Sequence, residues 1–313
     1  MEQMLEKVVS IHVEPTTRCN ASCPGCPRNN FGYGLKEGLK LIDIDVDFLT
    51  NFFNKCFNLA HIHLCGNRGD PIAYKHLKSL LSSLPINKYS VTIHTNGSLR
   101  STTWWAELGK YKSNALEVTF SIDGLADTNH IYRQATSFNK IIDNAKAFID
   151  AGGNAVWKFL TFKHNQHQVE EARELASNLG FIDFYTELPY ITNAYHWRTN
   201  QGYIAMELPE EENSVDVEQL HLQNINNFET EQTRIAKIEN NMWVNPSDCR
   251  HLKVWDDYGM YSLFISADGI IHPCCFWEDG RTESYSIESL DLDKEFSQGI
   301  YRKTCLEVCG TVK

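Results

Sequence analysis

The sequence has no long hydrophobic run, no excess of basic residues and no internal repeat. No stretch approaches the roughly 18 apolar residues of a membrane-spanning helix, and the N-terminus MEQMLEKVVS lacks the apolar segment of a signal peptide. Lys and Arg number 29 against 40 Asp and Glu, a formal net charge of -11, whereas proteins that bind the nucleic-acid backbone normally have a basic balance. We therefore expect a cytoplasmic protein with no membrane partner and no general nucleic-acid binding.

The cysteines are the most informative part of the composition. The chain has 313 residues, of which 42% are hydrophobic and 22% charged, which is typical of an ordinary globular protein of about two domains. It also has 10 cysteines. Disulfides rarely persist in the cytoplasm, so grouped cysteines indicate metal binding or redox chemistry. One group spans residues 19–26 and the other 249–309, while Cys56 and Cys65 lie apart from both.

Strand-like and helix-like segments alternate from residue 9 to about residue 186. Strands are predicted at residues 9–15, 61–65, 89–95, 116–122, 155–160 and 181–186, and apolar residues at helical spacing predict helices at 45–57, 73–83, 138–149 and 169–179. Strands joined by helices predict an α/β fold with a parallel sheet. A closed barrel of this kind normally has eight strands, so six units predict an open sheet or a partial barrel, with the active site on the loops that follow the strands in either case.

The alternation ends near residue 190, which predicts three parts of the chain. Residues 1–190 form the α/β core. Residues 191–248 are rich in Asn, Gln and Glu and are interpreted as a bridging region. Residues 249–313 have shorter hydrophobic patterns and are rich in aromatic residues and cysteine, which predicts a small second domain.

Three cysteines follow the first predicted strand at C-x3-C-x2-C spacing, namely Cys19, Cys23 and Cys26. A loop of this size can hold three corners of a cube-shaped 4Fe–4S cluster. Fully ligated clusters use four cysteines, so three leave one iron open to a substrate or cofactor. The alternative is a structural zinc site, but zinc normally takes four protein ligands, and no fourth Cys or His lies nearby at matching spacing.

This spacing after a first strand resembles the signature of the radical S-adenosylmethionine (SAM) superfamily. In that family the open iron is chelated by the amino and carboxylate groups of SAM. One electron from the reduced cluster cleaves SAM to methionine and a 5′-deoxyadenosyl radical, which abstracts hydrogen from a substrate. The resemblance implies a partial (β/α)6 barrel and an enzyme with a 4Fe–4S cluster and SAM as cofactors and a flavodoxin or ferredoxin as electron donor. The sequence departs from the family at Gly25, where an aromatic residue often precedes the third cysteine.

Motifs after the next three strands continue the resemblance. Gly66-Asn-Arg-Gly69-Asp70-Pro71 stands where the family has a Gly-Gly-Glu-Pro-like motif for the SAM amino group, with Asp70 in place of Glu. Asn96-Gly97 follows the third strand, and Asp123-Gly124 with Arg133 resembles the segment that contacts ribose and carboxylate. The SAM-binding residues that the resemblance implies are Gly66, Gly69, Asp70, Pro71, Asn96, Ser121, Asp123 and Arg133.

Elementary chemistry is consistent with these assignments. Asp70 can accept hydrogen bonds from an ammonium group, and Arg133 can pair with a carboxylate. Taken singly, Gly66 and Gly69 are also consistent with ordinary turns, as is Asp123-Gly124, and Arg133 with a surface arginine. The order of the motifs after successive strands favours the SAM site.

The C-terminal cysteines resemble those of SPASM and twitch domains, which hold auxiliary clusters in some radical SAM enzymes. The resemblance rests on Gly269-x4-Cys274 after an upstream cysteine. A full SPASM domain needs more cysteines than the five present, so a twitch-like domain with one auxiliary 4Fe–4S cluster is expected. The expected ligands are Cys249, Cys274, Cys305 and Cys309, with the adjacent Cys275 a buried thiol; a four-cysteine zinc site is the alternative.

The substrate is open to three hypotheses. Related enzymes modify peptides, mature other enzymes, or oxidise small alcohols and sugars, and we expect hydrogen abstraction from a peptide or protein side chain. Only about eight residues precede the first strand, so no fused leader-peptide-binding domain is expected. The second hypothesis is a dehydrogenase of a small polyol or sugar. The third is a non-enzymatic iron–sulfur electron carrier, which would need neither an open iron nor SAM motifs.

Four histidines lie on predicted strands, namely His12, His61, His63 and His94. Packing in the core or at the surface is the expected role, and lining of the cavity is the alternative. Cys65, beside Gly66, lies near the expected site.

Overall fold

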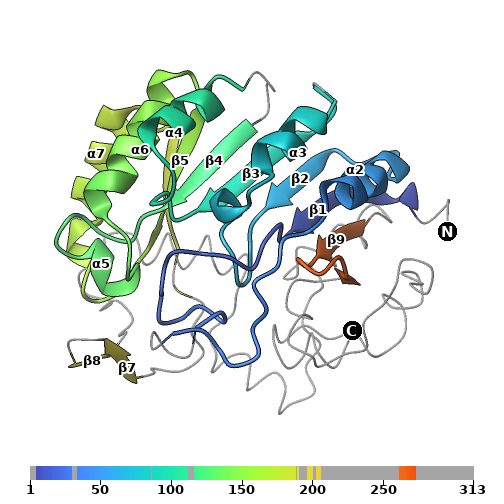
Figure 1. Ribbon diagram of the computed structural model, residues 1–313. Coiled ribbons are helices and arrows are strands. Elements are labelled where there is room, and N and C mark those ends of the chain that lie inside the picture. Colours follow the sequence, from blue (N-terminus) through green and yellow to red (C-terminus); the bar gives the residue numbers. More distant parts are fainter. Residues whose placement is uncertain are drawn as a thin grey trace, which may run out of the picture.

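The centre of the fold is an eight-stranded sheet in the order β10-β9-β1-β2-β3-β4-β5-β6 (Figure 1). The computed structural model describes residues 5–29, 34–85, 87–111, 116–187, 189, 196–199, 202–205 and 261–272.

The six strands predicted for the core are confirmed. They are β1 (Val8–Val13), β2 (His61–Leu64), β3 (Ser90–Thr95), β4 (Leu116–Ser121), β5 (Asn154–Leu160) and β6 (Asp183–Glu187). Each pairs in parallel with the next. Strands that follow one another in sequence are therefore neighbours in the sheet, as expected of successive strand–helix units. The predicted α/β fold with a largely parallel sheet is correct, and all six carboxyl ends meet at one edge.

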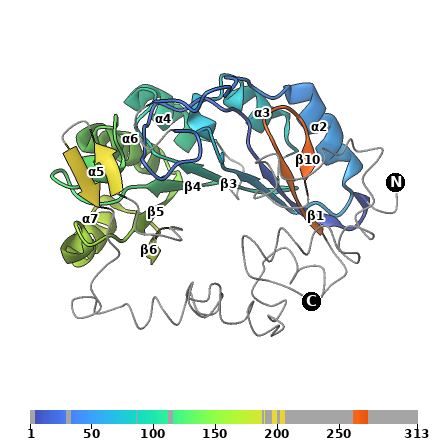
Figure 2. The same ribbon diagram turned by 90° about the horizontal axis from the view of Figure 1, so that it is seen from below.

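Helices cover one face of this sheet (Figure 2). The helices are α2 (Val46–Lys55), α3 (Leu77–Ser83), α4 (Thr102–Gly109), α5 (Asn129–Tyr132), α6 (Phe138–Asp150) and α7 (Val169–Leu179), with 3-10 turns η1 (Pro71–Ala73) and η2 (Gln166–Gln168). Their apolar stripes are buried against the strands, as Phe52 and Phe53 of α2 and Phe148 of α6 show. Among the described residues no helix is long and apolar enough to cross a membrane.

The opposite face of the sheet is polar near β1, β2 and β3. Successive side chains of a strand point to opposite faces. In β2, Ile62 and Leu64 are fully buried in the core, while His61 and His63 are half-buried. In β3, the half-buried His94 likewise lies between the buried residues Ile93 and Thr95. We call the side that carries these histidines the polar face.

Two further strands extend the sheet beyond β1. β9 (Tyr261–Ile265) is parallel to β1, and β10 (Ile271–His272) is antiparallel to β9. Gly269 in the connecting turn has a φ of +82°, a conformation that glycine adopts without steric cost. The described part of the predicted 249–313 domain is thus joined to the main sheet. A separate antiparallel pair, β7 (His196–Thr199) and β8 (Gly202–Ala205), lies in the predicted bridging region.

Candidate active site

The first cysteine group lies on the loop that follows β1, at the carboxyl end of the sheet. Cys23 is buried, Cys19 and Cys26 are half-buried, and all three are free thiols. They pack with Ala21, Tyr132, Phe162 and Leu160 in a small apolar cluster separate from the main core. The loop therefore holds three thiols in a largely dry environment.

This environment disfavours the thiolate form unless a cation is bound. Burial is the largest cause that raises the pKa of all three thiols, and it raises that of Cys23 to about 11. The proximity of Cys26 adds to the shift for Cys19 and Cys23. A metal centre reverses this balance, because a coordinating thiol is deprotonated outright. Three neighbouring thiols of this kind fit three corners of an iron–sulfur cluster.

The spacing of the thiols also bears on the zinc alternative. Within the described ranges, only His63, Cys65 and His94 form a group of three Cys, His or acidic residues tight enough to share one metal ion. Cys19, Cys23 and Cys26 are not such a group, so their sulfur atoms do not all lie within 4.8 Å of one another, which is consistent with a centre larger than a single ion.

Asn96 connects the cysteine loop to the end of β2. Its Nδ2 donates to Cys19 Sγ at 3.6 Å, to Asn20 Oδ1 at 3.0 Å and to Asp70 Oδ2 at 2.7 Å. Asp70 is buried and also accepts from the backbone nitrogens of Asn96 at 2.8 Å and Ile72 at 2.9 Å, and from Thr95 Oγ1 at 2.8 Å. Burial raises the pKa of Asp70, and these hydrogen bonds oppose the shift.

The two glycines before Asp70 are required by close backbone approach. A Cβ on Gly69 would lie 1.7 Å from the carbonyl oxygen of Thr16, and one on Gly66 would lie 2.3 Å from that of Gly69. The buried Glu14 holds the same segment, because its Oε1 accepts from the backbone nitrogens of Arg68 at 2.5 Å and Gly69 at 3.0 Å. The segment is thus packed directly against the start of the cysteine loop.

Arg28 is a site residue for which the sequence predicted no role. Its guanidinium is buried and donates to the carbonyl oxygens of Thr17, of Arg68 at 3.2 Å and of Cys19 at 3.4 Å. A buried arginine needs acceptors, and here they are the backbone of two loops. Arg28 therefore joins the cysteine loop to the Gly66–Asp70 segment.

Arg133 is not a surface arginine. Its Nε donates to Asp123 Oδ2 at 2.5 Å, and its Nη1 lies 3.9 Å from Cys23 Sγ. Burial lowers the pKa of Arg133, but Asp123, Cys23 and Tyr132 together outweigh it and raise the pKa overall, so the group stays charged. Asp123 is itself fixed by a hydrogen bond from the backbone nitrogen of Leu160 at 2.8 Å. A positive charge is thereby held beside Cys23.

The structure brings the predicted core residues together. Ser121 ends β4 and Pro71 begins η1, and both are buried. The three cysteines and all eight predicted SAM residues therefore lie at the carboxyl ends of β1, β2, β3 and β4 or on the segments that follow them. The predicted C-terminal residues Cys249, Cys274, Cys275, Cys305 and Cys309 lie outside the described residues.

Residues 13–179 match the sequence profile of the radical SAM superfamily, which is more than half of the 313-residue chain. The chain belongs to the radical SAM superfamily. Membership makes it an enzyme and implies a 4Fe–4S cluster and SAM as its cofactors. The alternative of a non-enzymatic electron carrier is therefore wrong.

Solved structures share the fold of this radical SAM enzyme. Streptococcus suis SuiB bound to S-adenosylmethionine is 16% identical with a TM-score of 0.63, over 96% of this chain and 68% of that chain. SuiB bound to precursor peptide SuiA is 15% identical with a TM-score of 0.62, over 99% and 71%. Native anSMEcpe with bound AdoMet and Cp18Cys peptide is 14% identical with a TM-score of 0.58, over 96% and 82%. No curated protein matches the chain.

The role of Arg28 gives a first prediction. Replacing Arg28 with Met leaves three backbone carbonyls without their buried donor, so the cysteine loop should lose its fixed geometry. We expect the iron content of the anaerobically reconstituted, desalted enzyme to fall by up to about four atoms per chain, the content of one 4Fe–4S cluster. Arg18→Met is the matched control, because the Arg18 side chain is 46% exposed and pairs with Asp43 at the surface. Equal iron content in Arg28→Met and wild type would refute the role of Arg28.

Proposed function

We propose that this radical SAM enzyme holds its 4Fe–4S cluster through Cys19, Cys23 and Cys26 and abstracts hydrogen from a peptide or protein side chain. The observation that carries the proposal is the convergence of three buried or half-buried free thiols with Asn96 and Arg133 at the carboxyl ends of parallel strands. When bound, the cluster supplies the electron that cleaves SAM and so generates the radical.

The chain's own residues prepare this site in three ways. The apolar cluster around Tyr132 and Phe162 excludes water from the thiols. Arg133 places a positive charge beside Cys23, which favours the thiolate form that binds metal. Asn96 donates toward the sulfur of Cys19, and hydrogen bonds to cluster sulfurs tune the potential of such centres.

We propose that SAM lies between the ends of β2, β3 and β4. The proposed contacts are Gly66, Gly69, Asp70, Pro71, Asn96, Ser121, Asp123 and Arg133. The Asp70 carboxylate already accepts hydrogen bonds from Ile72, Thr95 and Asn96. Asp70 therefore has two proposed roles: it fixes the segments at the ends of β2 and β3, and it attracts the SAM ammonium group. Two of the five N–H donors of a guanidinium are directed from Arg133 to Asp123 and Cys23, and the others would serve the SAM carboxylate.

A peptide is the substrate class we favour. The structures of SuiB with precursor peptide SuiA and of anSMEcpe with Cp18Cys peptide show peptides bound to proteins of this fold. On β5 and β6, the Lys158–Glu187 ion pair and the partly exposed Tyr185 add hydrogen-bonding groups near the same edge. A small polyol or sugar is the second candidate, since it would use the same kind of groups.

The remaining parts of the proposal concern the rest of the chain. We propose a radical SAM core at residues 1–190, a bridging region at 191–248 and a twitch-like domain at 249–313. The β9–β10 hairpin lies beside β1, and His272 of β10 precedes Cys274 by two residues, which is consistent with an auxiliary centre near this edge of the sheet. We propose a cytoplasmic location, where thiols stay reduced, and a flavodoxin or ferredoxin as electron donor.

Transfer of deuterium tests the substrate class. Reduced enzyme and SAM would be incubated with deuterated peptides or deuterated polyols, and 5′-deoxyadenosine would be analysed by mass spectrometry. We expect deuterium in 5′-deoxyadenosine from at least one peptide pool and none from polyols, because the abstracted atom moves to the 5′ carbon. Transfer from a polyol alone would establish the second candidate instead.

The auxiliary cluster gives a further prediction. If Cys249, Cys274, Cys305 and Cys309 hold one 4Fe–4S cluster, Cys274→Ala should lower the iron content by up to about four atoms per chain. Cys275→Ala is the matched control and should keep that iron, because adjacent cysteines seldom both bind one cluster. Loss of iron in Cys275→Ala alone would reverse the ligand choice. Release of zinc in place of iron would establish a structural zinc site.

A further inference from the structure

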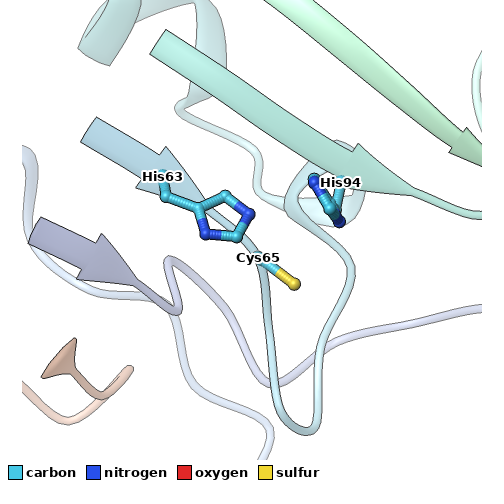
Figure 3. A group of neighbouring side chains, drawn as sticks. All are labelled: His63, Cys65 and His94. Carbon is cyan, nitrogen blue, oxygen red and sulfur yellow. The ribbon is translucent and has the colours of Figure 1, made fainter. Parts of the chain in front are cut away.

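A second group of metal-binding side chains lies outside the cysteine loop, on the polar face of the sheet. It consists of His63 on β2, Cys65 directly after β2, and His94 on β3 (Figure 3). One ligand atom from each residue lies within 4.8 Å of the others, and all three residues are half-buried. The proposed cluster and SAM site uses none of the three side chains.

The parallel pairing of β2 and β3 produces this group. His63 and Cys65 are two residues apart and so point to the same face. His94 is two residues beyond Thr92, the residue that pairs with His63, so its side chain joins them from the neighbouring strand. The ring centroids of His63 and His94 are 4.5 Å apart. The group is therefore fixed by strand register and not by a long loop.

Neighbouring residues hold the group in place. The backbone nitrogen of Cys65 donates to the carbonyl oxygen of Val13 at 3.1 Å, and its carbonyl oxygen accepts from His12 Nε2 at 2.6 Å. The His12 ring also stacks on the His63 ring, with centroids 4.8 Å apart. These contacts restrain the backbone of Cys65 and the ring of His63.

The donor set matches a particular class of ion. Imidazole and thiolate together suit zinc and related transition metals, whereas carboxylate and carbonyl oxygens suit magnesium and calcium. Zn–S bonds of about 2.3 Å and Zn–N bonds of about 2.0 Å place tetrahedral ligand atoms roughly 3.3–3.6 Å apart. The three ligand atoms lie within 4.8 Å of one another, so they would have to draw together by up to about 1.5 Å to reach that spacing.

We propose that His63, Cys65 and His94 bind one zinc-class divalent cation. Structural zinc sites have four protein ligands, whereas sites with three leave a position for water or substrate. The described residues supply three, and these are half-buried, so a further position remains for an exogenous ligand. The class of ligand that such a position takes is a carboxylate, thiolate or imidazole.

The proposed ion would lie close enough to the proposed SAM site to take part in substrate binding. His94 precedes Asn96 by two residues, which is about 7 Å along an extended chain, and Asn96 contacts Cys19 Sγ. A ligand on the ion would thus lie close to the proposed SAM site. That the ion anchors the substrate rests on the proposed function, whereas the binding of the ion is independent of that function.

Zinc content and zinc X-ray absorption test the proposal on the full-length reconstituted enzyme. The protein would be equilibrated with excess Zn²⁺ and desalted, with no SAM present. We expect His63→Gln and His94→Gln each to contain one zinc per chain less than wild type. Cys65→Ser should lose a Zn–S contribution from the zinc spectrum. His61→Gln is the matched control, because His61 lies on the same strand and face but is tied to Ser90 Oγ at 2.7 Å, and it should keep the full zinc content.

Iron content separates this test from that of the proposed function. Wild-type iron in each variant shows that the cysteine loop is intact, and three independent variants keep the test decisive if one fails to fold. The proposal is overturned if His63→Gln and His94→Gln retain the same zinc as wild type. It is also overturned if the zinc of wild type is bound by sulfur alone. Either result leaves the radical SAM assignment unchanged.

Discussion

The buried carboxylate of Asp70 is the interaction on which the site depends. It accepts hydrogen bonds from the start of η1 and from the end of β3, and through Asn96 it reaches the sulfur of Cys19. A buried carboxylate is costly unless it is fully hydrogen-bonded, and each hydrogen bond to a charged group contributes about 1.5–3 kcal/mol. The ends of β2 and β3 and the cysteine loop are therefore held in one arrangement.

Two further buried charges complete this arrangement. Arg28 ties the cysteine loop to the Gly66–Asp70 segment, and Asp123 holds Arg133 against Cys23. Thiols that burial keeps neutral thus lie among fixed donors and a fixed cation. The donors and the cation favour a bound centre with net negative charge, and the metal ions of that centre would stabilise the thiolate form of the cysteines. The same rigid strand ends present the His63–Cys65–His94 group.

Sequence reasoning located the core because local patterns determine it. Alternating apolar residues and helical spacing placed all six core strands to within about two residues, and the three cysteines and the later motifs could be assigned by their order after those strands. Glu14 and Arg28 could not be assigned, because their partners are backbone groups of other loops. The pairing of β9 with β1 was also missed. It joins Val8 to Tyr261, 253 residues apart, and a five-residue strand carries no signal for a partner so distant.

Electron paramagnetic resonance of the reduced, full-length enzyme tests the central claim most directly. If Cys19, Cys23 and Cys26 hold a cluster with one open iron, SAM should change the signal of that cluster. A variant with all three cysteines changed to Ala should lose both the signal and its response to SAM. A signal that is insensitive to SAM in wild type, or that persists with its SAM response in the triple variant, would contradict the account.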